Sequence, residues 1–520
     1  MTARGSQPSN RNANLVPSAS TPFRNYIRSP TVSVMVNIST SSASPLDGLD
    51  QRPKLAWLVL AGLLVVFIVL KLPVLKIPYF WDELNVYATG SLYMHDHGIG
   101  ILPAQLDPEY SRGHPLLSYA YTAIFYKLFG DSVAVGHTSA ILMAAAVLWM
   151  LFRTGKRVFG TGAALGGVAV LICQPIFFSM AGVIYPEMLL ALVVVWGIYA
   201  LAAGRWGQFA IAGSLAVLTK EPGLILPAAA GVYWLADLIR TKAFRAKQTW
   251  MALLALLTPV GIYGLFLVIQ KVQNGWYFFP YHLELIHSDA GYMIGIVRRL
   301  LEELFAQQGR WLVSVPLLIS LVFFRKVFPT TLQQRYVWAF VLVLLFTLLF
   351  ASVNFYLARY WIFVYPSFIL LGIQAWVGLS RHVLKQRGWM VAILGMAAAG
   401  LMAVRRMDGK SFADNYDMAY VYTVHTVQDC IDWMQTQPAI LSDTPRVTFP
   451  IFEALRDPRN GYVTRPIPHS QKWDAPSRFF LIYRLPYETI PDFLNGKEVK
   501  RFQKYDNTIY VFDTRPPVAL

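Results

Sequence analysis

The sequence predicts a polytopic α-helical membrane protein that ends in a small soluble α+β domain. The chain has 520 residues, of which 55% are hydrophobic and only 14% are charged, whereas soluble domains average about 25% charged residues. Its mean hydropathy is +0.44, and long apolar runs recur along most of the chain. This combination is typical of a protein with many membrane spans rather than of one large soluble core.

Apolar runs define the predicted spans. Most approach the length of about 20 residues that a helix needs to cross a bilayer. One run is short and ends at Thr219-Lys220-Glu221-Pro222, so we expect a half-length helix that breaks at the proline. The runs lie at 55–70, 132–152, 162–180, 187–203, 208–219, 223–239, 250–270, 311–324, 336–352, 360–379 and 389–404, which gives about 11 spans.

Basic residues predict the orientation of these spans. The formal net charge is +16, and the basic residues concentrate in alternate short loops such as 153–157 and 240–247. Loops rich in Lys and Arg stay in the cytoplasm. The loops alternate consistently between the cytoplasmic and the outer side if residues 84–95 and 115–129 form interfacial helices on the outer face. Because topology accounts for the positive charge, we do not expect a nucleic-acid partner.

Composition divides the chain into three parts. Residues 1–53 are rich in Ser, Thr, Asn and Pro and are predicted to be a disordered cytoplasmic tail. Residues 54–404 form the predicted transmembrane domain. Residues 405–520 are polar, with strand-like runs at 446–449, 479–483 and 508–512, and are predicted to form a domain outside the cytoplasm. The two cysteines lie in unlike contexts, so a disulfide framework is not expected.

Three carboxylates on the predicted outer face are candidate catalytic residues. Asp82 and Glu83 follow the first span, and Glu187 follows Pro186 where two spans adjoin. Ionisable groups near the membrane core are costly and tend to be functional. The structural alternative is that each acid favours the positive end of the helix that it begins.

Four basic side chains on the same face are candidates for binding a phosphate. Arg112 and His114 lie in the first outer loop, Lys220 lies at the predicted helix break, and Arg359 begins a span. Arginine suits phosphate because it donates two parallel hydrogen bonds. The structural alternatives are a head-group contact for His114, an ion pair with Glu221 for Lys220, and an interfacial anchor for Arg359.

The order of these features resembles the GT-C membrane glycosyltransferases. The features are the carboxylate pair after the first span, Gly113-His114-Pro115, the sequence GKRVFG at 155–160, an acid at the next outer turn, and the sequence LTKEPGLILP at 218–227. The group that the chain resembles is the protein O-mannosyltransferase and aminoarabinose transferase type (families 39 and 83). The resemblance covers about residues 55–380.

The resemblance implies a polyprenyl-phosphate-linked sugar donor and transfer on the outer face of the membrane. It implies that Asp82 is the essential acid of the first outer loop, with Glu83 beside it. Glu187 falls where the family often has a second acid, although that acid is usually aspartate.

The resemblance also implies roles for three of the basic residues. His114 matches the histidine of the mannosyltransferase HPPL motif, although Leu116 replaces the second proline. Lys220 matches the lysine of the TK-P motif, and Arg359 resembles the arginine near the lipid phosphate.

The chemistry of the residues agrees with this function. A sugar hydroxyl is a poor nucleophile at neutral pH, so a positioned carboxylate such as Asp82 is useful as a general base. The departing polyprenyl phosphate needs positive charge or a metal ion, and Asp82 with Glu187 are the candidate ligands of a divalent metal. His282 and His287 are five residues apart and so not on one helical face, which disfavours a zinc site there.

We therefore expect a bacterial-type inner-membrane glycosyltransferase that acts on a glycolipid, polysaccharide or protein acceptor. One base without a separate nucleophile indicates a single displacement that inverts the anomeric centre. The alternatives are a transporter or flippase of a lipid-linked saccharide and a membrane scaffold without enzymatic activity. Transporters place ionisable residues on broken helices at mid-membrane, whereas these acids cluster in outer loops.

Overall fold

The computed structural model describes residues 48–242, 247–384, 388–404, 417–471, 477–484 and 490–515. The predicted disordered tail lies outside these ranges up to residue 47. The described residues belong to one compact unit. Before the first long helix, Asp50 Oδ1 accepts a hydrogen bond from Thr161 N at 2.9 Å. The last residues of the predicted tail therefore contact the start of a helix more than 100 positions later.

Eleven apolar helices form the main body of the described chain. Six are long and apolar enough to cross a membrane, at Pro53–Lys76, Val133–Val158, Glu221–Thr241, Lys247–Asn274, Thr331–Ser352 and Ala358–His382. Five shorter ones lie at Thr161–Ile172, Pro186–Ala202, Trp206–Thr219, Trp311–Val322 and Trp389–Val404. The chain is a multi-pass membrane protein, and the number of its spans stays a prediction.

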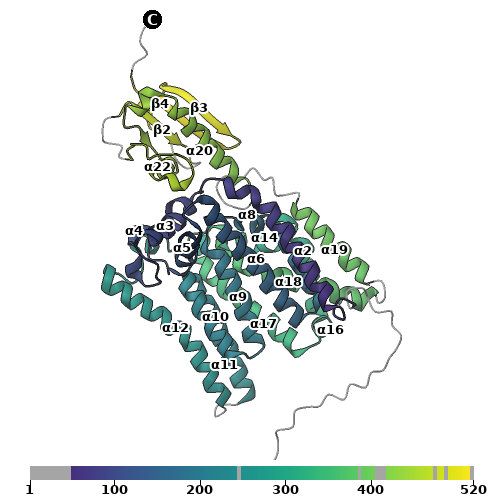
Figure 1. Cartoon of the computed structure of the whole chain (residues 1–520). Coiled ribbons are helices and arrows are strands. Elements are labelled where there is room, and N and C mark those ends of the chain that lie inside the picture. The colour runs from purple at the N-terminus through teal and green to yellow at the C-terminus, as the bar shows by residue number, and fades with distance from the viewer. Residues whose placement is uncertain are drawn as a thin grey trace, which may run out of the picture. The chain divides into compact units, whose positions relative to one another are not determined.

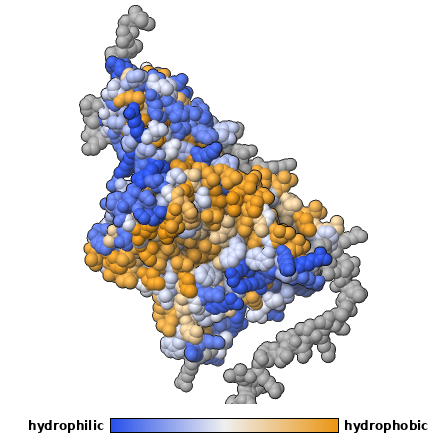
Figure 2. All heavy atoms as spheres, viewed as in Figure 1, coloured by the Kyte–Doolittle hydropathy of each residue, from blue (hydrophilic) through white to orange (hydrophobic). Residues whose placement is uncertain are grey.

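These apolar helices and two short helices between them, α8 and α16, are labelled as in Figure 1. They are α2 (Pro53–Lys71), α6 (Val133–Val158), α7 (Thr161–Ile172), α8 (Pro175–Met180), α9 (Pro186–Ala202), α10 (Trp206–Thr219), α11 (Ile225–Thr241), α12 (Lys247–Asn274), α15 (Trp311–Val322), α16 (Phe324–Val327), α17 (Thr331–Ser352), α18 (Tyr365–Leu384) and α19 (Gly388–Val404). In Figure 2, apolar side chains gather over these helices and hydrophilic ones over the C-terminal domain.

Two prolines break the predicted runs. The run at 162–180 is not one helix, because α7 ends before Pro175 and the short helix α8 begins there; proline lacks the N–H that would continue the hydrogen-bond ladder. The predicted break after Thr219 is confirmed. Lys220 is extended, and the short 3-10 helix η4 (Glu221–Leu224) follows it. Gly223 fits there because a Cβ would lie 2.1 Å from the Ala216 carbonyl oxygen.

Short helices gather in two long loops, one between α2 and α6 and the other between α12 and α15. The first loop holds η1 (Leu72–Lys76), η2 (Glu83–Tyr87), α3 (Ala88–His97), η3 (Pro103–Gln105), α4 (Pro108–Ser111) and α5 (Leu117–Phe129). The second holds α13 (Pro280–Glu284), α14 (Ala290–Phe305) and η5 (Gln307–Gly309), and η6 (Ala358–Val364) precedes α18. In Figure 1, α3, α4 and α5 lie together at one end of the long helices. Helices at 84–95 and 115–129 agree with the prediction.

The C-terminal domain is a small α+β fold. Its elements are α20 (Tyr420–Gln435), α21 (Pro438–Leu441), β1 (Arg446–Val447), α22 (Ile451–Arg456), η8 (Pro458–Asn460), β2 (Phe479–Tyr483), η9 (Asp492–Leu494), β3 (Glu498–Lys504) and β4 (Asn507–Asp513). The strand order is β1-β2-β4-β3, with β1 parallel to β2 and the other pairs antiparallel. Alternate residues of β2 and β4 face opposite sides of the sheet, so Leu481 and Val511 join the main core while Phe480 and Phe512 form a smaller one.

The three predicted strands are present, but β3 was missed. Its residues are mostly exposed and charged, as is common for a strand at the edge of a sheet. A polar strand of this kind has no apolar run that sequence patterning can detect.

Candidate active site

Asp82 and Arg359 meet although 277 residues separate them. Asp82 stands directly before η2 with its side chain 25% exposed, whereas the Arg359 side chain is only 1% exposed. Arg359 Nη2 donates a hydrogen bond to Asp82 Oδ2. A predicted acid and a predicted phosphate-binding residue therefore form one ion pair at the end of a span.

Aromatic rings surround the buried Arg359 guanidinium. Its Cζ lies 4.6 Å from the ring centre of Tyr185 and 5.2 Å from that of Tyr360. A cation over the face of a tyrosine ring is stabilised by the ring quadrupole. These rings supply part of the compensation that a buried charge needs in addition to its single carboxylate partner.

Glu187 and Lys220 form a second, fully buried ion pair. Glu187 lies in the first turn of α9 after Pro186, and its Oε1 accepts a hydrogen bond from Lys220 Nζ at 2.7 Å. The Lys220 ammonium also lies 4.1 Å from the ring centre of Tyr360. The extended backbone of Lys220 at the break after α10 allows the side chain to turn toward α9.

The alternative that Lys220 pairs with its neighbour Glu221 is wrong. Glu221 accepts a hydrogen bond from His114 Nδ1 at 2.9 Å instead. Adjacent residues on either side of a helix break point in different directions, and so they find different partners.

Tyrosines join the two ion pairs into one site. Tyr360 contacts both Lys220 and Arg359, and Tyr87 packs edge-on against Tyr185 with ring centres 5.6 Å apart. Sequence reasoning did not select these tyrosines. Their position in the sequence could have identified them, because Tyr185 directly precedes Pro186-Glu187 and Tyr360 directly follows Arg359.

Glu83 faces away from this group. Its side chain is 1% exposed; Oε2 accepts from Phe80 N at 3.1 Å and Oε1 accepts from Ile184 N at 2.7 Å. His137 Nε2 lies 3.1 Å from Oε1. Glu83 thus ties the segment that carries Asp82 to the segment that precedes Glu187, which is a positioning role distinct from the predicted catalytic one.

Glu83→Ala is expected to destabilise the protein by about 3 kcal/mol, because it leaves two buried N–H groups without an acceptor. Glu83→Gln keeps one acceptor oxygen and should lose less. The apparent melting temperature in detergent measures the difference. A Glu83→Ala protein that melts like the wild type yet transfers no sugar would instead indicate a direct catalytic role.

Arg112 and His114 lie beside the same site. The His114 ring stacks over Tyr87 at 6.4 Å between ring centres. Arg112 has a left-handed backbone with φ 48°, and its Nη2 lies 2.7 Å from the Asn85 amide oxygen when that amide is turned to satisfy both of its neighbours. All four predicted basic residues and two of the three predicted acids therefore gather around the N-terminal end of α9 and the C-terminal end of α10.

Comparisons with known proteins found one family model and several solved structures that resemble this chain. A family model of dolichyl-phosphate-mannose-protein mannosyltransferases matches residues 113–263, the segment that contains His114, Glu187 and Lys220. The crystal structure of ArnT from Cupriavidus metallidurans in the apo state is similar, with a TM-score of 0.52 and 15% identity over 87% of this chain and 98% of that one. The chain therefore has the fold of that ArnT structure. The ArnT structure bound to undecaprenyl phosphate is similar as well, with a TM-score of 0.50 and 14% identity over 88% of this chain and 99% of that one.

A search of curated protein sequences found no match to this chain. At the identities quoted, the structural likeness establishes the fold, and the residues at the site must carry any argument about activity.

A metal ion does not fit the predicted ligand pair. Within the described ranges, no three His, Cys, Asp or Glu side chains gather as a metal-binding group. Asp82 and Glu187 each face a cationic side chain, Arg359 and Lys220 respectively. His282 and His287 also have separate surroundings, since the first ring lies 4.8 Å from His114 and the second lies 4.0 Å from Tyr292. The proposed reaction uses no metal ion.

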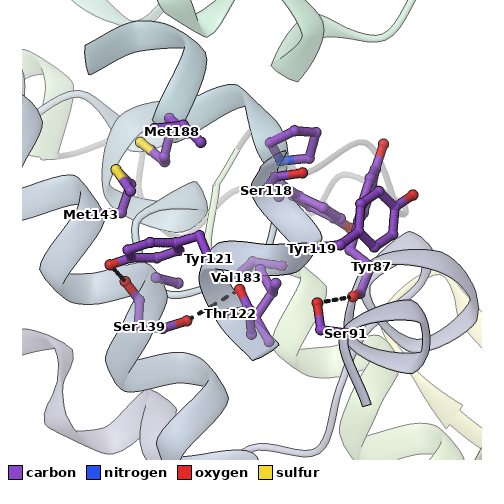
Figure 3. A pocket seen from close by; sticks show the side chains of 15 residues that line it. Tyr87, Ser91, Ser118, Tyr119, Tyr121, Thr122, Ser139, Met143, Val183 and Met188 are labelled. Carbon is purple, nitrogen blue, oxygen red and sulfur yellow. Dashed lines mark hydrogen bonds between the residues drawn. The ribbon is translucent and has the colours of Figure 1, made fainter. Parts of the chain in front are cut away.

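A small, mostly apolar pocket that also carries serine, threonine and tyrosine side chains lies beside Tyr87 (Figure 3). Tyr121 Oη donates to the Ser139 carbonyl at 3.0 Å, and the hydroxyls of Thr122 and Ser139 lie 3.4 Å apart. These bonds join α5 to α6 and hold the loop between α2 and α6 against the long helices. The pocket has no charged side chain in its lining, and it borders the ion-pair site because Tyr87 and Tyr185 belong to both.

His282 makes the stability of the loop between α12 and α15 pH-dependent. Burial, with the nearby His114, lowers the pKa of His282 to about 4 from 6.5; Glu221 opposes this shift, and Lys220 and Arg112 add to it. Above pH 6.5 the ring is neutral in both states. Between pH 6.5 and about 4 only the unfolded chain takes up the proton, so stability falls across that window. The wild type should therefore lose more apparent melting temperature between pH 7.5 and 4.5 than His282→Gln; equal losses would contradict this assignment.

Proposed function

We propose that this protein transfers a sugar from a polyprenyl-phosphate-linked donor to an acceptor hydroxyl or phosphate on the outer face of the membrane. The observation that carries the proposal is the pairing of Asp82 with Arg359 and of Glu187 with Lys220 around shared tyrosines. Such a site holds a base and two cations within one aromatic pocket on a GT-C scaffold.

The donor phosphate would take over the cations from the carboxylates. An anionic phosphate in contact with Arg359 and Lys220 competes with Asp82 and Glu187 for the same donors. Asp82 is the more exposed of the two acids, so its pairing is the easier one to exchange. Release from Arg359 makes Asp82 a better proton acceptor, which couples donor binding to activation of the base.

The reaction is a single displacement. The acceptor oxygen attacks the anomeric carbon, and its proton moves to Asp82. The bond between that carbon and the phosphate oxygen breaks, and the negative charge of the departing polyprenyl phosphate is stabilised by Arg359 and Lys220. Attack opposite to the leaving group inverts the anomeric centre. Glu187 keeps Lys220 charged and in place, and Arg112 and His114 extend the positive surface beside the site.

The predicted topology belongs to the same proposal. The basic loops and the N-terminal tail at 1–53 face the cytoplasm of a bacterial-type inner membrane, the domain at 54–404 spans it, and the domain at 405–520 lies on the outer face. The positive-inside pattern of the loops supports this orientation.

A donor panel tests the function. The full chain in lipid nanodiscs is incubated with undecaprenyl- and dolichyl-phosphate sugars and an envelope extract as acceptor, and released polyprenyl phosphate is measured by mass spectrometry. We expect acceptor-dependent release from at least one donor. No release from any donor, together with translocation of a fluorescent lipid-linked saccharide across vesicles, would contradict the proposal and favour the transporter.

A further inference from the structure

The residue before Asp82 has an unusual backbone. Trp81 has φ 51°, in the left-handed region that bulky side chains rarely adopt without support from their surroundings. The Trp81 conformation sets the direction in which the chain enters η2, and hence the direction of the Asp82 side chain.

Aromatic side chains of the C-terminal domain hold this segment. The Trp81 ring packs edge-on against Phe449 at 4.8 Å and against Tyr483 at 6.1 Å between ring centres. Phe80 packs against Tyr420 at 5.2 Å. We call these five residues the aromatic clamp.

Hydrogen bonds to the backbone of Tyr79 hold the same segment. Tyr79 N donates to the Asn460 carbonyl at 3.1 Å, and Tyr462 Oη donates to the Tyr79 carbonyl at 3.0 Å. Between them, Gly461 has φ 91°, and a Cβ there would lie 3.2 Å from Pro78 Cα. The two backbone segments therefore approach so closely that a side chain at position 461 would displace its neighbours.

Arg459 supplies a third, electrostatic attachment. Its guanidinium lies 2.9 Å from Asp96 and 3.6 Å from Asp131, both outside the C-terminal domain, and 2.8 Å from Asp457 within it. Contacts of three independent kinds thus attach the domain to the first outer loop close to Asp82.

We propose that the C-terminal domain positions the catalytic base, with Trp81 and Phe449 as positioning residues. This inference rests on the proposed function of Asp82. The domain is then a working part of the site: when the aromatic clamp opens, the left-handed turn at Trp81 loses its support and Asp82 leaves its productive direction.

Hydrogen exchange combined with kinetics on the full chain tests the proposal. Phe449→Ala should speed amide exchange in residues 79–85 by about tenfold or more, and it should lower kcat by about 10²-fold with little change in KM for the donor. Trp81→Ala should behave in the same way, and Trp81→Phe should recover most of kcat because it keeps a ring against Phe449.

Tyr505→Ala is the matched control. Tyr505 is an aromatic residue of the same domain with φ 54°, and it packs against Tyr422 at 4.4 Å, in the turn between β3 and β4. This variant should change neither exchange at 79–85 nor kcat.

Unchanged exchange in Phe449→Ala would overturn the clamp, and faster exchange with unchanged kcat would overturn the positioning role. Because hydrogen exchange needs no substrate, it tests the aromatic clamp independently of the proposed sugar transfer. A wild-type chain that releases no polyprenyl phosphate overturns the proposed function and, with it, only the catalytic part of this inference.

Discussion

Asp82→Asn is expected to lower kcat about a thousandfold, the typical contribution of a positioned general base. Asparagine keeps the size of the side chain but cannot take the acceptor proton. The substitution also removes the carboxylate that occupies Arg359, so KM for the donor should stay constant or fall. Initial rates over a range of donor concentrations separate the two effects.

Asp107→Asn is the control for that measurement. Asp107 is another aspartate of the loop between α2 and α6, and it caps α4 through a 2.8 Å hydrogen bond from Glu109 N, a role that asparagine fills equally well. Full activity of Asp82→Asn, with Asp107→Asn also active, would reject Asp82 as the base. A covalent glycosyl-enzyme trapped on any residue would reject the single displacement.

Lys220→Met should destabilise the protein by about 3–5 kcal/mol, because it leaves Glu187 buried without its cation. It should also weaken donor binding about a hundredfold, since a charged hydrogen bond to the phosphate is lost. The double variant Glu187→Gln/Lys220→Met should recover much of the stability but none of the donor affinity. Thermal unfolding and donor KM measure the two quantities independently.

Lys271→Met is the control for lost positive charge. Lys271 lies exposed near the C-terminal end of α12, where Nζ donates a hydrogen bond to the Gly275 carbonyl. Its loss should change neither quantity. If the double variant regains donor affinity together with stability, Lys220 supports the fold and does not bind the donor.

Local sequence patterns were sufficient to locate the apolar helices, the helices near 84–95 and 115–129, and three strands, but not α14 or α20. An apolar run of about 20 residues is a local feature of the sequence. The proline that follows the end of α10 is a local signal as well. The edge strand β3 and the break between α7 and α8 were missed, because a polar strand has no apolar signal and because Pro175 lies inside a run that remains hydrophobic on both sides.

The partners within the site could not be predicted in the same way. Sequence placed Asp82, Glu187, Lys220 and Arg359 on one face, since sidedness follows from topology. It could not assign Arg359 to Asp82 across 277 positions, nor reveal that Glu83 binds backbone N–H groups, because these depend on how the helices pack. The contact between Trp81 and Phe449 joins two predicted domains and was invisible for the same reason.

A structure of the full chain with undecaprenyl phosphate tests the central claim most directly. We expect phosphate oxygens within hydrogen-bond distance of both Arg359 and Lys220. We also expect Asp82 to be released from Arg359 and to face the space beside the phosphate. A phosphate bound elsewhere, with the Asp82–Arg359 and Glu187–Lys220 pairs intact, would contradict it.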